Sequence, residues 1–218
     1  MTFKSFNPIA APLGFYPVVP DADWVQRLLN WGLRTVQLRF KALRHGDLDI
    51  ALQVRAAVAA GRAVPGAQVF INDHWRLALS EGAYGVHLGQ GDWAALGISE
   101  RDALRASHLR LGLSTHTPEE LQLAKSVQPS YLAIGPVFPT TLKVMPYEPV
   151  GLERLKLWVQ HAAPYPAVAI GGISLESLPQ VIACGVNGVA VVSAVTQAKN
   201  PQEAALSGLS MASGQSKR

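Results

Sequence analysis

The chain has 218 residues, of which 49% are hydrophobic and 16% are charged, and its net charge is +4. This composition excludes a disordered or fibrous chain, and no apolar run is long enough to span a bilayer. The basic residues are scattered along the chain, which argues against a nucleic-acid-binding protein and fits a mildly basic enzyme that acts on anionic substrates.

Short runs rich in valine, isoleucine, leucine or aromatic residues recur along the chain. Most of them end at or near a glycine, a proline or a small polar residue, which is typical of β-strands. In chain order, the runs are residues 14–20, 35–41, 68–73, 85–90, 109–116, 131–138, 167–173 and 188–195.

The segments between these runs have the spacing of amphipathic helices. Residues 21–32 carry apolar side chains at i, i+4 and i+7, which predicts a helix with one buried face. Residues 117–127 begin with Thr117, a good N-cap, followed by a proline and two acids. A further helix is expected over residues 174–185, where Pro179 should shift or kink it.

Eight strands alternating with about eight helices predict an α/β fold, a single (β/α)8 TIM barrel. The alternative is an open doubly wound sheet, which usually carries a glycine-rich loop after its first strand. Here Asp-Ala-Asp follows the first strand instead. We expect one catalytic barrel domain over residues 1–207, and a frayed polar tail over residues 208–218.

The active site of such a barrel lies at the carboxyl ends of its strands, so unusual polar residues are expected there. Gln37, Arg39 and Lys41 alternate along the second run and therefore share a face. Two cations on one face repel each other unless an anion joins them, which predicts an anionic ligand. The alternative, a pair of surface ions, would place Gln37 inward without a partner.

Two acids lie at the ends of neighbouring strands: Asp73 is the last residue of the third run, and Asp92 follows the fourth. Carboxylates without histidine or cysteine suit Mg²⁺ that is shared with a phosphorylated substrate, so both acids are candidate metal ligands. Two alternatives stay open. In the first, Asp73 is the N-cap of the following helix; in the second, Asp92 is a solvated loop acid.

A second anion site is expected at the last two strands. Gly171 and Gly172 lie at the end of the seventh run and Ser193 belongs to the eighth, which is where these barrels often bind phosphate. Glycine lets the backbone approach a ligand closely, although a tight turn also explains the pair. His87, in the middle of the fourth run, is interpreted as a satisfied core residue and not as a ligand.

These positions describe a basic cluster, two acids and a phosphate cradle, with few groups suited to act as a base. No HExxH zinc pattern and no GxSxG nucleophile motif occurs. The site therefore fits two phosphorylated ligands, one of them bound with Mg²⁺, and a diphosphate leaving group that cations neutralise.

The chain resembles the thiamine-phosphate synthase family, also called thiamine-phosphate pyrophosphorylase. The resemblance rests on QLRFK (37–41), FINDHWRLA (70–78), YGVHLGQGD (84–92), LGLSTHTPEE (111–120), GPVFPTTLK (135–143), AIGGIS (169–174) and AVVSAV (190–195). It implies an enzyme that joins 4-amino-5-hydroxymethyl-2-methylpyrimidine diphosphate to a thiazole phosphate, giving thiamine phosphate and pyrophosphate. It also implies a dissociative route, in which the C–O bond breaks before the thiazole nitrogen attacks.

The resemblance further implies roles for individual residues. Asp73 and Asp92 would bind Mg²⁺. The catalytic residues would be Arg39, Lys41, Ser114 and Lys143. The pyrimidine diphosphate would be held by Gln37, Leu38, Arg39, Phe40, Lys41, Asn72, Ser114 and Lys143. The thiazole phosphate would be held by Thr140, Thr141, Leu142, Gly172, Val192 and Ser193, with Val192 acting through its backbone.

One residue departs from the family pattern. The family usually reads Pro-Thr-x-Thr-Lys, whereas residues 139–143 read Pro-Thr-Thr-Leu-Lys, so Leu142 replaces the second threonine. If that hydroxyl contacts the substrate, its loss costs about 0.5–1.5 kcal/mol, or about 1.5–3 kcal/mol where the acceptor is charged. This predicts weaker substrate binding and not an inactive enzyme.

Two other functions fit the same barrel. A thiazole tautomerase would keep the phosphate cradle, but family resemblance implies a catalytic histidine directly after the glycine of the sixth-strand motif, where this chain has Pro136. A non-catalytic sensor of a phosphorylated ligand is supported only by Leu142. Such a sensor would have little reason to keep two acids beside a basic cluster, so the synthase is favoured.

The remaining expectations concern the setting of the protein. A single cysteine, Cys184, excludes an internal disulfide and fits a reducing compartment, and the N-terminus shows no signal-peptide pattern. We therefore expect a cytoplasmic enzyme that acts on small molecules, without a nucleic-acid or membrane partner. A homodimer is compatible with the sequence.

Overall fold

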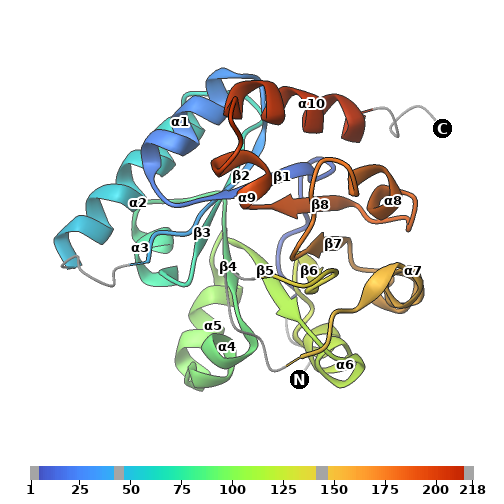
Figure 1. Ribbon diagram of the computed structural model, residues 1–218. Helices are drawn as coiled ribbons and strands as arrows, with labels where there is room; N and C mark the ends of the chain where they lie inside the picture. The colour runs from blue at the N-terminus through green and yellow to red at the C-terminus, as the bar shows by residue number, and fades with distance from the viewer. Residues whose placement is uncertain (1–4, 42–46, 141–146, 214–218) are drawn as a thin grey trace.

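The computed structural model of the protein describes residues 5–41, 47–140 and 147–213. Its strands form one closed barrel in the order β1 to β8, and each strand runs parallel to its neighbours (Figure 1). The expected (β/α)8 barrel is thereby confirmed. The strands are β1 (Gly14–Val19), β2 (Thr35–Leu38), β3 (Gln68–Asn72), β4 (Gly85–Leu88), β5 (Arg110–Thr115), β6 (Tyr131–Ile134), β7 (Ala167–Ile170) and β8 (Gly188–Val191).

Helices surround this barrel on the outside (Figure 1). Within the described ranges, none of them is long and apolar enough to cross a membrane. The helices are α1 (Ala22–Asn30), α2 (Asp47–Arg62), α3 (Trp75–Ser80), α4 (Gln90–Ala95), α5 (Ile98–Ala106), α6 (Pro118–Val127), α7 (Gly151–Ala162), α8 (Leu178–Ile182), α9 (Ser193–Thr196) and α10 (Pro201–Ser213).

Two helices begin at residues whose side chains cap them, and one of these, Thr117, is the predicted N-cap. The side chain of Asp21 accepts a hydrogen bond from the Trp24 backbone N–H at 2.8 Å at the start of α1. Thr117 accepts from the Glu120 N–H at the start of α6, where Pro118 is the first helical residue. Each cap satisfies a backbone donor that has no partner inside its helix.

The barrel interior is filled by large side chains that face inward at alternate positions of the strands. Phe70 from β3 packs against Tyr131 from β6 and Tyr16 from β1, with ring centroids 5.2 and 5.8 Å away. Two glycines make room for these rings. A Cβ on Gly112 would lie 2.2 Å from the Tyr131 ring, and one on Gly85 would lie 2.6 Å from the Phe70 ring.

Several strands end earlier than their apolar runs. The run 131–138 is a strand only to Ile134, and the run 188–195 only to Val191, so Ser193 begins α9 and does not belong to β8. The expected helix start at residue 174 is also wrong, because α8 begins at Leu178. Pro179 therefore lies in the first turn, where its missing N–H is not needed and the helix is not kinked.

The expected polar tail at 208–218 is wrong for its first residues. Helix α10 continues to Ser213, and Gly208 is buried against the barrel. A Cβ on Gly208 would lie 2.3 Å from the Phe15 ring of β1, so the glycine lets α10 approach the strand. The packing of Gly208 on β1 explains why the helix continues through this serine- and glycine-rich segment. Residues 214–218 lie outside the described part of the chain.

Candidate active site

A cavity of about 310 Å³ opens at the carboxyl ends of the strands, which is the position expected for this fold. Its wall contains polar residues from the ends of several strands together with apolar residues from β7 and β8. Among the sequence-predicted site residues, those that line it are Gln37, Arg39, Lys41, Asn72, Asp73, Asp92, Ser114, Thr140, Gly172, Val192 and Ser193.

The end of β2 supplies the polar side chains that the alternation predicts. Gln37 is buried, with 4% of its surface exposed, and its Nε2 donates to the Tyr16 hydroxyl at 3.0 Å. Gln37 is therefore inward with a partner, so an unpartnered Gln37 is no longer an argument against the surface-ion alternative; the position of Arg39 and Lys41 at the cavity is what argues against it. Arg39 and Lys41 follow on the same side and reach the same cavity.

Two predicted binding residues of this segment do not line the cavity. Leu38 is 1% exposed and belongs to the apolar core, and Phe40 packs against that core. Their side chains point the other way because they alternate with Gln37, Arg39 and Lys41. Any contact of Leu38 or Phe40 with a ligand would have to come from the backbone.

Asp73 directly follows β3 and pairs with Lys41. Its Oδ2 lies 2.5 Å from the Lys41 Nζ, and the two side chains are 27% and 46% exposed. Its φ is +63°, a left-handed conformation that aspartate tolerates better than most residues. Asp73 is not the N-cap of α3: that position is His74, without a side-chain cap.

Asp92 is exposed, as the second alternative expects, but it lies in the first turn of α4 and not in a loop. Its Oδ2 accepts a hydrogen bond from the Gly89 backbone N–H at 3.2 Å. Asp73 and Asp92 both line the cavity, but in the described part of the chain no cluster of three or more acids, histidines or cysteines forms a complete metal cage. A pair of carboxylates fits Mg²⁺, which commonly takes one or two protein carboxylates and completes its shell with water and substrate phosphates.

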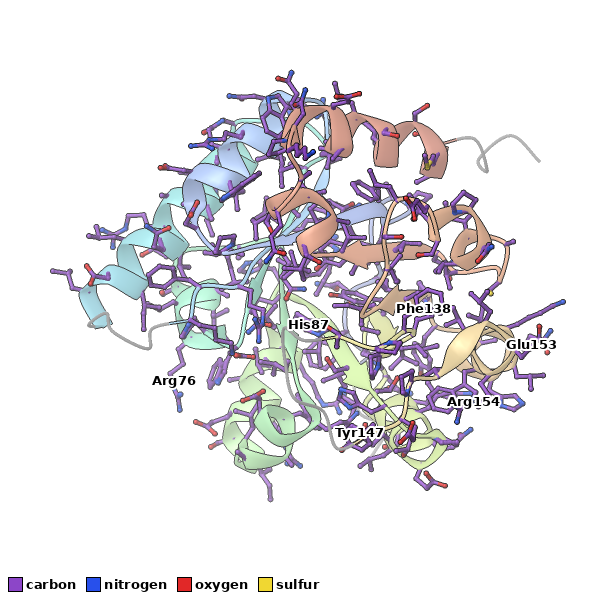
Figure 2. All side chains as sticks on the ribbon, in the orientation of Figure 1. Arg76, His87, Phe138, Tyr147, Glu153 and Arg154 are labelled. Atoms are coloured by element: carbon purple, nitrogen blue, oxygen red, sulfur yellow. The ribbon has the colours of Figure 1, made fainter. Side chains whose placement is uncertain are left out.

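Ser114 at the end of β5 shares a hydrogen bond with His87 from β4. The Ser114 Oγ lies 2.9 Å from His87 Nε2, while His87 Nδ1 lies 2.8 Å from the Tyr131 hydroxyl. Figure 2 places His87 near the middle of the ring of strands. The interpretation of His87 as a hydrogen-bonded core residue is therefore correct, but no pattern in the sequence indicated that its ring also reaches the cavity wall.

Burial sets the protonation of this group of side chains. It lowers the pKa of His87 to about 4, although the nearby Asp73 carboxylate acts in the opposite direction. It also raises the pKa of both buried phenols, Tyr16 and Tyr131. At neutral pH these three side chains are therefore uncharged.

The segments after β6 and β7 are held against each other by backbone hydrogen bonds. The N–H of Val137 donates to the Ile170 carbonyl and that of Phe138 to the Gly171 carbonyl, each at 3.0 Å. Gly172 has a φ of +69°, and a Cβ there would lie 2.5 Å from the Pro139 carbonyl oxygen. Position 172 therefore requires a glycine because the segment after β6 lies so close, whether or not a ligand binds there.

Only part of the segment GPVFPTTLK (135–143) can be placed in the cavity wall. Thr140 lines the cavity. Thr141, Leu142 and Lys143 lie outside the described residues, so their predicted roles stay predictions. Val192 and Ser193 reach the cavity at the start of α9.

Two stacked rings lie at the edge of the same cavity, and the sequence did not indicate that they would pair. His116 lines the cavity and stacks on Tyr147, with centroids 4.8 Å apart and planes 5° from parallel. Glu120 joins the two rings: its Oε2 lies 2.8 Å from His116 Nδ1, and its Oε1 accepts from the Tyr147 hydroxyl at 3.0 Å. The spacing of His116 and Glu120, four residues apart at a helix start, was the available signal.

The closed parallel barrel and the polar cavity at its strand ends define a (β/α)8-barrel enzyme. Residues 16–195 match the family model described as thiamine monophosphate synthase. The chain belongs to that family, whose enzymes are transferases.

Curated relatives and a solved structure agree with this family. The chain is 53% identical over 193 residues to a thiamine-phosphate synthase of Escherichia coli O1:K1, covering 88% of this chain and 89% of the relative. It is 50% identical over 199 residues to that of Photorhabdus laumondii, covering 91% and 89%. It superposes on a thiamine phosphate pyrophosphorylase from Pyrococcus furiosus with a TM-score of 0.79 and 29% identity, covering 93% and 96%.

A more distant structure shares the fold alone. A 3-hexulose-6-phosphate synthase superposes with a TM-score of 0.62 and 16% identity, covering 90% of this chain and 98% of that one. At this identity its activity carries nothing over to the present chain. The relatives that are half identical carry the name thiamine-phosphate synthase, so they give no support to the tautomerase or the sensor.

Proposed function

We propose that the protein joins 4-amino-5-hydroxymethyl-2-methylpyrimidine diphosphate to a thiazole phosphate, releasing pyrophosphate and forming thiamine phosphate. The observation that carries this proposal is that Arg39 and Lys41 line one cavity together with Asp73 and Asp92, in a chain of this family. Cations and a pair of carboxylates at one place suit a diphosphate that is bound with a divalent metal.

Departure of the leaving group is the step that these residues assist. The bond between the methylene carbon and the diphosphate oxygen breaks, and the diphosphate leaves with the electron pair. Arg39 and Lys41 stabilise the charge that develops on that oxygen, and the Ser114 hydroxyl donates a hydrogen bond to the diphosphate. The thiazole nitrogen then bonds to the methylene carbon, and no proton has to move. The scarcity of groups suited to act as a base agrees with this chemistry.

Asp73 and Asp92 are the residues that would hold Mg²⁺. When bound, Mg²⁺ would neutralise charge on the diphosphate and favour its departure. Lys41 now occupies one oxygen of Asp73, at 2.5 Å. Lys41 is thus placed to contact both the carboxylate and a diphosphate beside it.

The two organic parts of the substrates would occupy different sides of the cavity. Gln37 and Asn72, both buried, would hold the pyrimidine through their amide groups. Thr140, Gly172, Val192 and Ser193, with the undescribed Thr141 and Leu142, would hold the thiazole phosphate. The apolar wall, which includes Val18, Ile170 and Ile173, would keep water from capturing the pyrimidine cation.

The proposal is tested by incubating the purified protein with both substrates and Mg²⁺. Equal amounts of thiamine phosphate and pyrophosphate should form, and chelation of the metal should stop the reaction. Lys41→Ala should slow it strongly, whereas Lys156→Ala, a matched change on the exposed surface of α7, should not. Absence of pyrophosphate release, or release that does not need the thiazole phosphate, would contradict the proposed function.

A further inference from the structure

A chain of hydrogen bonds crosses the barrel interior from Gln37 to Ser114. Gln37 Nε2 donates to the Tyr16 hydroxyl at 3.0 Å, and that hydroxyl lies 3.0 Å from the hydroxyl of Tyr131. Tyr131 lies 2.8 Å from His87 Nδ1, and His87 Nε2 lies 2.9 Å from the Ser114 Oγ. The described contacts thus join five side chains from β1, β2, β4, β5 and β6 in one line.

The two phenols in this line do not meet a ligand. Tyr16 and Tyr131 are 1% and 0% exposed and do not line the cavity, whereas Gln37, His87 and Ser114 do. Both ring nitrogens of His87 already have partners within the line. The phenol rings are fixed by packing on Phe70. Buried hydroxyls must find their partners within the line, because desolvated polar groups without a hydrogen bond are costly.

The hydrogen bonds of this line can all point from donor to acceptor in either of two directions, because of the number of protons that the five side chains carry. Each hydroxyl has one hydrogen to donate, and an imidazole with one proton donates on one side and accepts on the other. If Gln37 Nε2 donates to Tyr16, then Tyr16 donates to Tyr131 and Tyr131 to His87 Nδ1. His87 Nε2 then donates to Ser114, whose own O–H is free to donate into the cavity.

The opposite direction reverses every bond. Ser114 then donates to His87, His87 to Tyr131 and Tyr131 to Tyr16, and Tyr16 donates to Gln37 Oε1 after the amide has turned over. In the first direction Gln37 offers its oxygen to a ligand and Ser114 offers a proton. In the second, Gln37 offers its NH₂ group and Ser114 only a lone pair.

We propose that this line couples the orientation of the Gln37 amide to that of the Ser114 hydroxyl, and that Tyr16, Tyr131 and His87 are positioning residues for the reaction. A ligand amino group that donates to Gln37 Oε1 selects the first direction and turns the Ser114 O–H toward an anion. The pyrimidine end of the substrate thereby prepares the site for its diphosphate end. The inference rests on the proposed function, which supplies a ligand with an amino group and a diphosphate.

The coupling is measured as a cycle of equilibrium binding, with Mg²⁺ present and thiazole phosphate absent. The ligands are the aminopyrimidine diphosphate and an analogue in which hydrogen replaces the amino group, each titrated into wild type and Ser114→Ala. When Tyr16 and Tyr131 are intact, the fold-loss of binding affinity caused by Ser114→Ala should be about fivefold larger for the amino ligand than for the analogue. When Ser114→Ala is made in the Tyr131→Phe protein, where the line is broken, the losses of affinity for the two ligands should agree within about twofold.

Two further variants separate coupling from packing. Tyr16→Phe breaks the line at another point and should abolish the coupling in the same way, even if Tyr131→Phe folds poorly. Tyr84→Phe also removes a hydroxyl, one that donates to Gln68 Oε1 at 2.5 Å and lies outside the cavity, so it should leave the coupling intact. If the coupling were lost only because packing is disturbed, all three tyrosine-to-phenylalanine variants would lose it alike.

Each remaining outcome contradicts a specific claim. If the amino ligand binds but the Ser114→Ala losses are equal for both ligands in the wild-type background, the coupling is refuted while the proposed function stands. A coupling that survives both Tyr131→Phe and Tyr16→Phe also refutes it. If the aminopyrimidine diphosphate does not bind the wild-type protein, the proposed function fails and the inference fails with it.

Discussion

Lys41 Nζ lies 2.5 Å from Asp73 Oδ2, joining the segment that follows β2 to the segment that follows β3. The two residues are separated by 32 positions in the sequence and carry opposite charges beside the same cavity. The pair is partly exposed, so its contribution to stability is small. Its position at the cavity points instead to a role in ligand and metal binding.

Asp73→Asn is expected to weaken Mg²⁺ binding with little effect on folding. Asparagine adopts the left-handed backbone of Asp73 as readily as aspartate, but it lacks the charge. The Mg²⁺ concentration for half-maximal activity should rise by about 10–100-fold, by analogy with losses at metal-site partners. Asp23→Asn, a matched change on the exposed first turn of α1, should leave it unchanged. An unaltered Mg²⁺ dependence in Asp73→Asn would exclude Asp73 as a ligand.

Gly112→Ala is expected to destabilise the barrel. The added methyl group would lie 2.2 Å from the Tyr131 ring, which has no free space to move into because it is fully buried. Overpacking of this kind costs about 1–3 kcal/mol in the free energy of unfolding, measured by chemical denaturation. Gly91→Ala, in helix α4 with no atom within 4 Å of the added methyl group, should be neutral or slightly stabilising. Equal stability of the two variants would refute the packing argument.

Gly172→Ala is expected to weaken binding of the thiazole phosphate. The substitution places a methyl group 2.5 Å from the Pro139 carbonyl oxygen at a φ of +69°, so the segments after β6 and β7 must separate. Gly66→Ala shares the unfavourable conformation, with a φ of +76°, but meets no atom within 4 Å. Both variants should lose about 1 kcal/mol or more of stability. Only Gly172→Ala should raise the KM for thiazole phosphate, and a similar rise in Gly66→Ala would show that backbone strain alone is responsible.

Leu142→Thr restores the hydroxyl that the family pattern carries. If this hydroxyl binds substrate, the change should tighten binding by about 2–12-fold, corresponding to about 0.5–1.5 kcal/mol. Leu142→Val is the matched control, because valine has the shape of threonine without the hydroxyl. Steady-state kinetics with each substrate would measure the effect. The same KM in both variants would mean that the hydroxyl is not used by this enzyme.

Stability should decrease as the pH falls from about 6.5 toward 4, because of His87. Burial lowers the pKa of His87 to about 4 in the folded protein, below the value of 6.5 expected when unfolded. Between these values the unfolded chain binds more protons, so lowering the pH favours unfolding by up to about 1.4 kcal/mol per pH unit. His87→Gln, which cannot ionise, should have a correspondingly flatter pH dependence in denaturant titrations. Parallel curves for the two proteins would contradict the lowered pKa.

The sequence by itself determined the barrel and much of the cavity wall. The alternation of apolar runs with helical segments predicts parallel strands joined by helices, and the side-chain alternation within a strand places Gln37, Arg39 and Lys41 on one face. Both acids after β3 and β4 reach the cavity for the same reason: parallel strands bring their carboxyl ends to one edge of the barrel.

The sequence did not determine where continuous apolar runs stop being strands. The segment 131–138 reads as one run, but its second half leaves the sheet to bond to the segment after β7. The tail from residue 208 looks polar and mobile in composition, but the burial of Gly208 against Phe15 extends α10 to Ser213. Composition describes which residue types a segment contains, whereas the burial of a residue depends on what packs against it in the fold.

Only the tertiary structure decided which side chains become partners. Tyr16 and Tyr131 share a hydrogen bond across 115 positions of sequence, and the room for the Tyr131 ring comes from the absence of a side chain at Gly112 on the neighbouring strand. Closure of the barrel brings such residues together, and burial then requires their polar atoms to bond to one another. The periodicity of one strand carries no information about the residue that will face it across the interior.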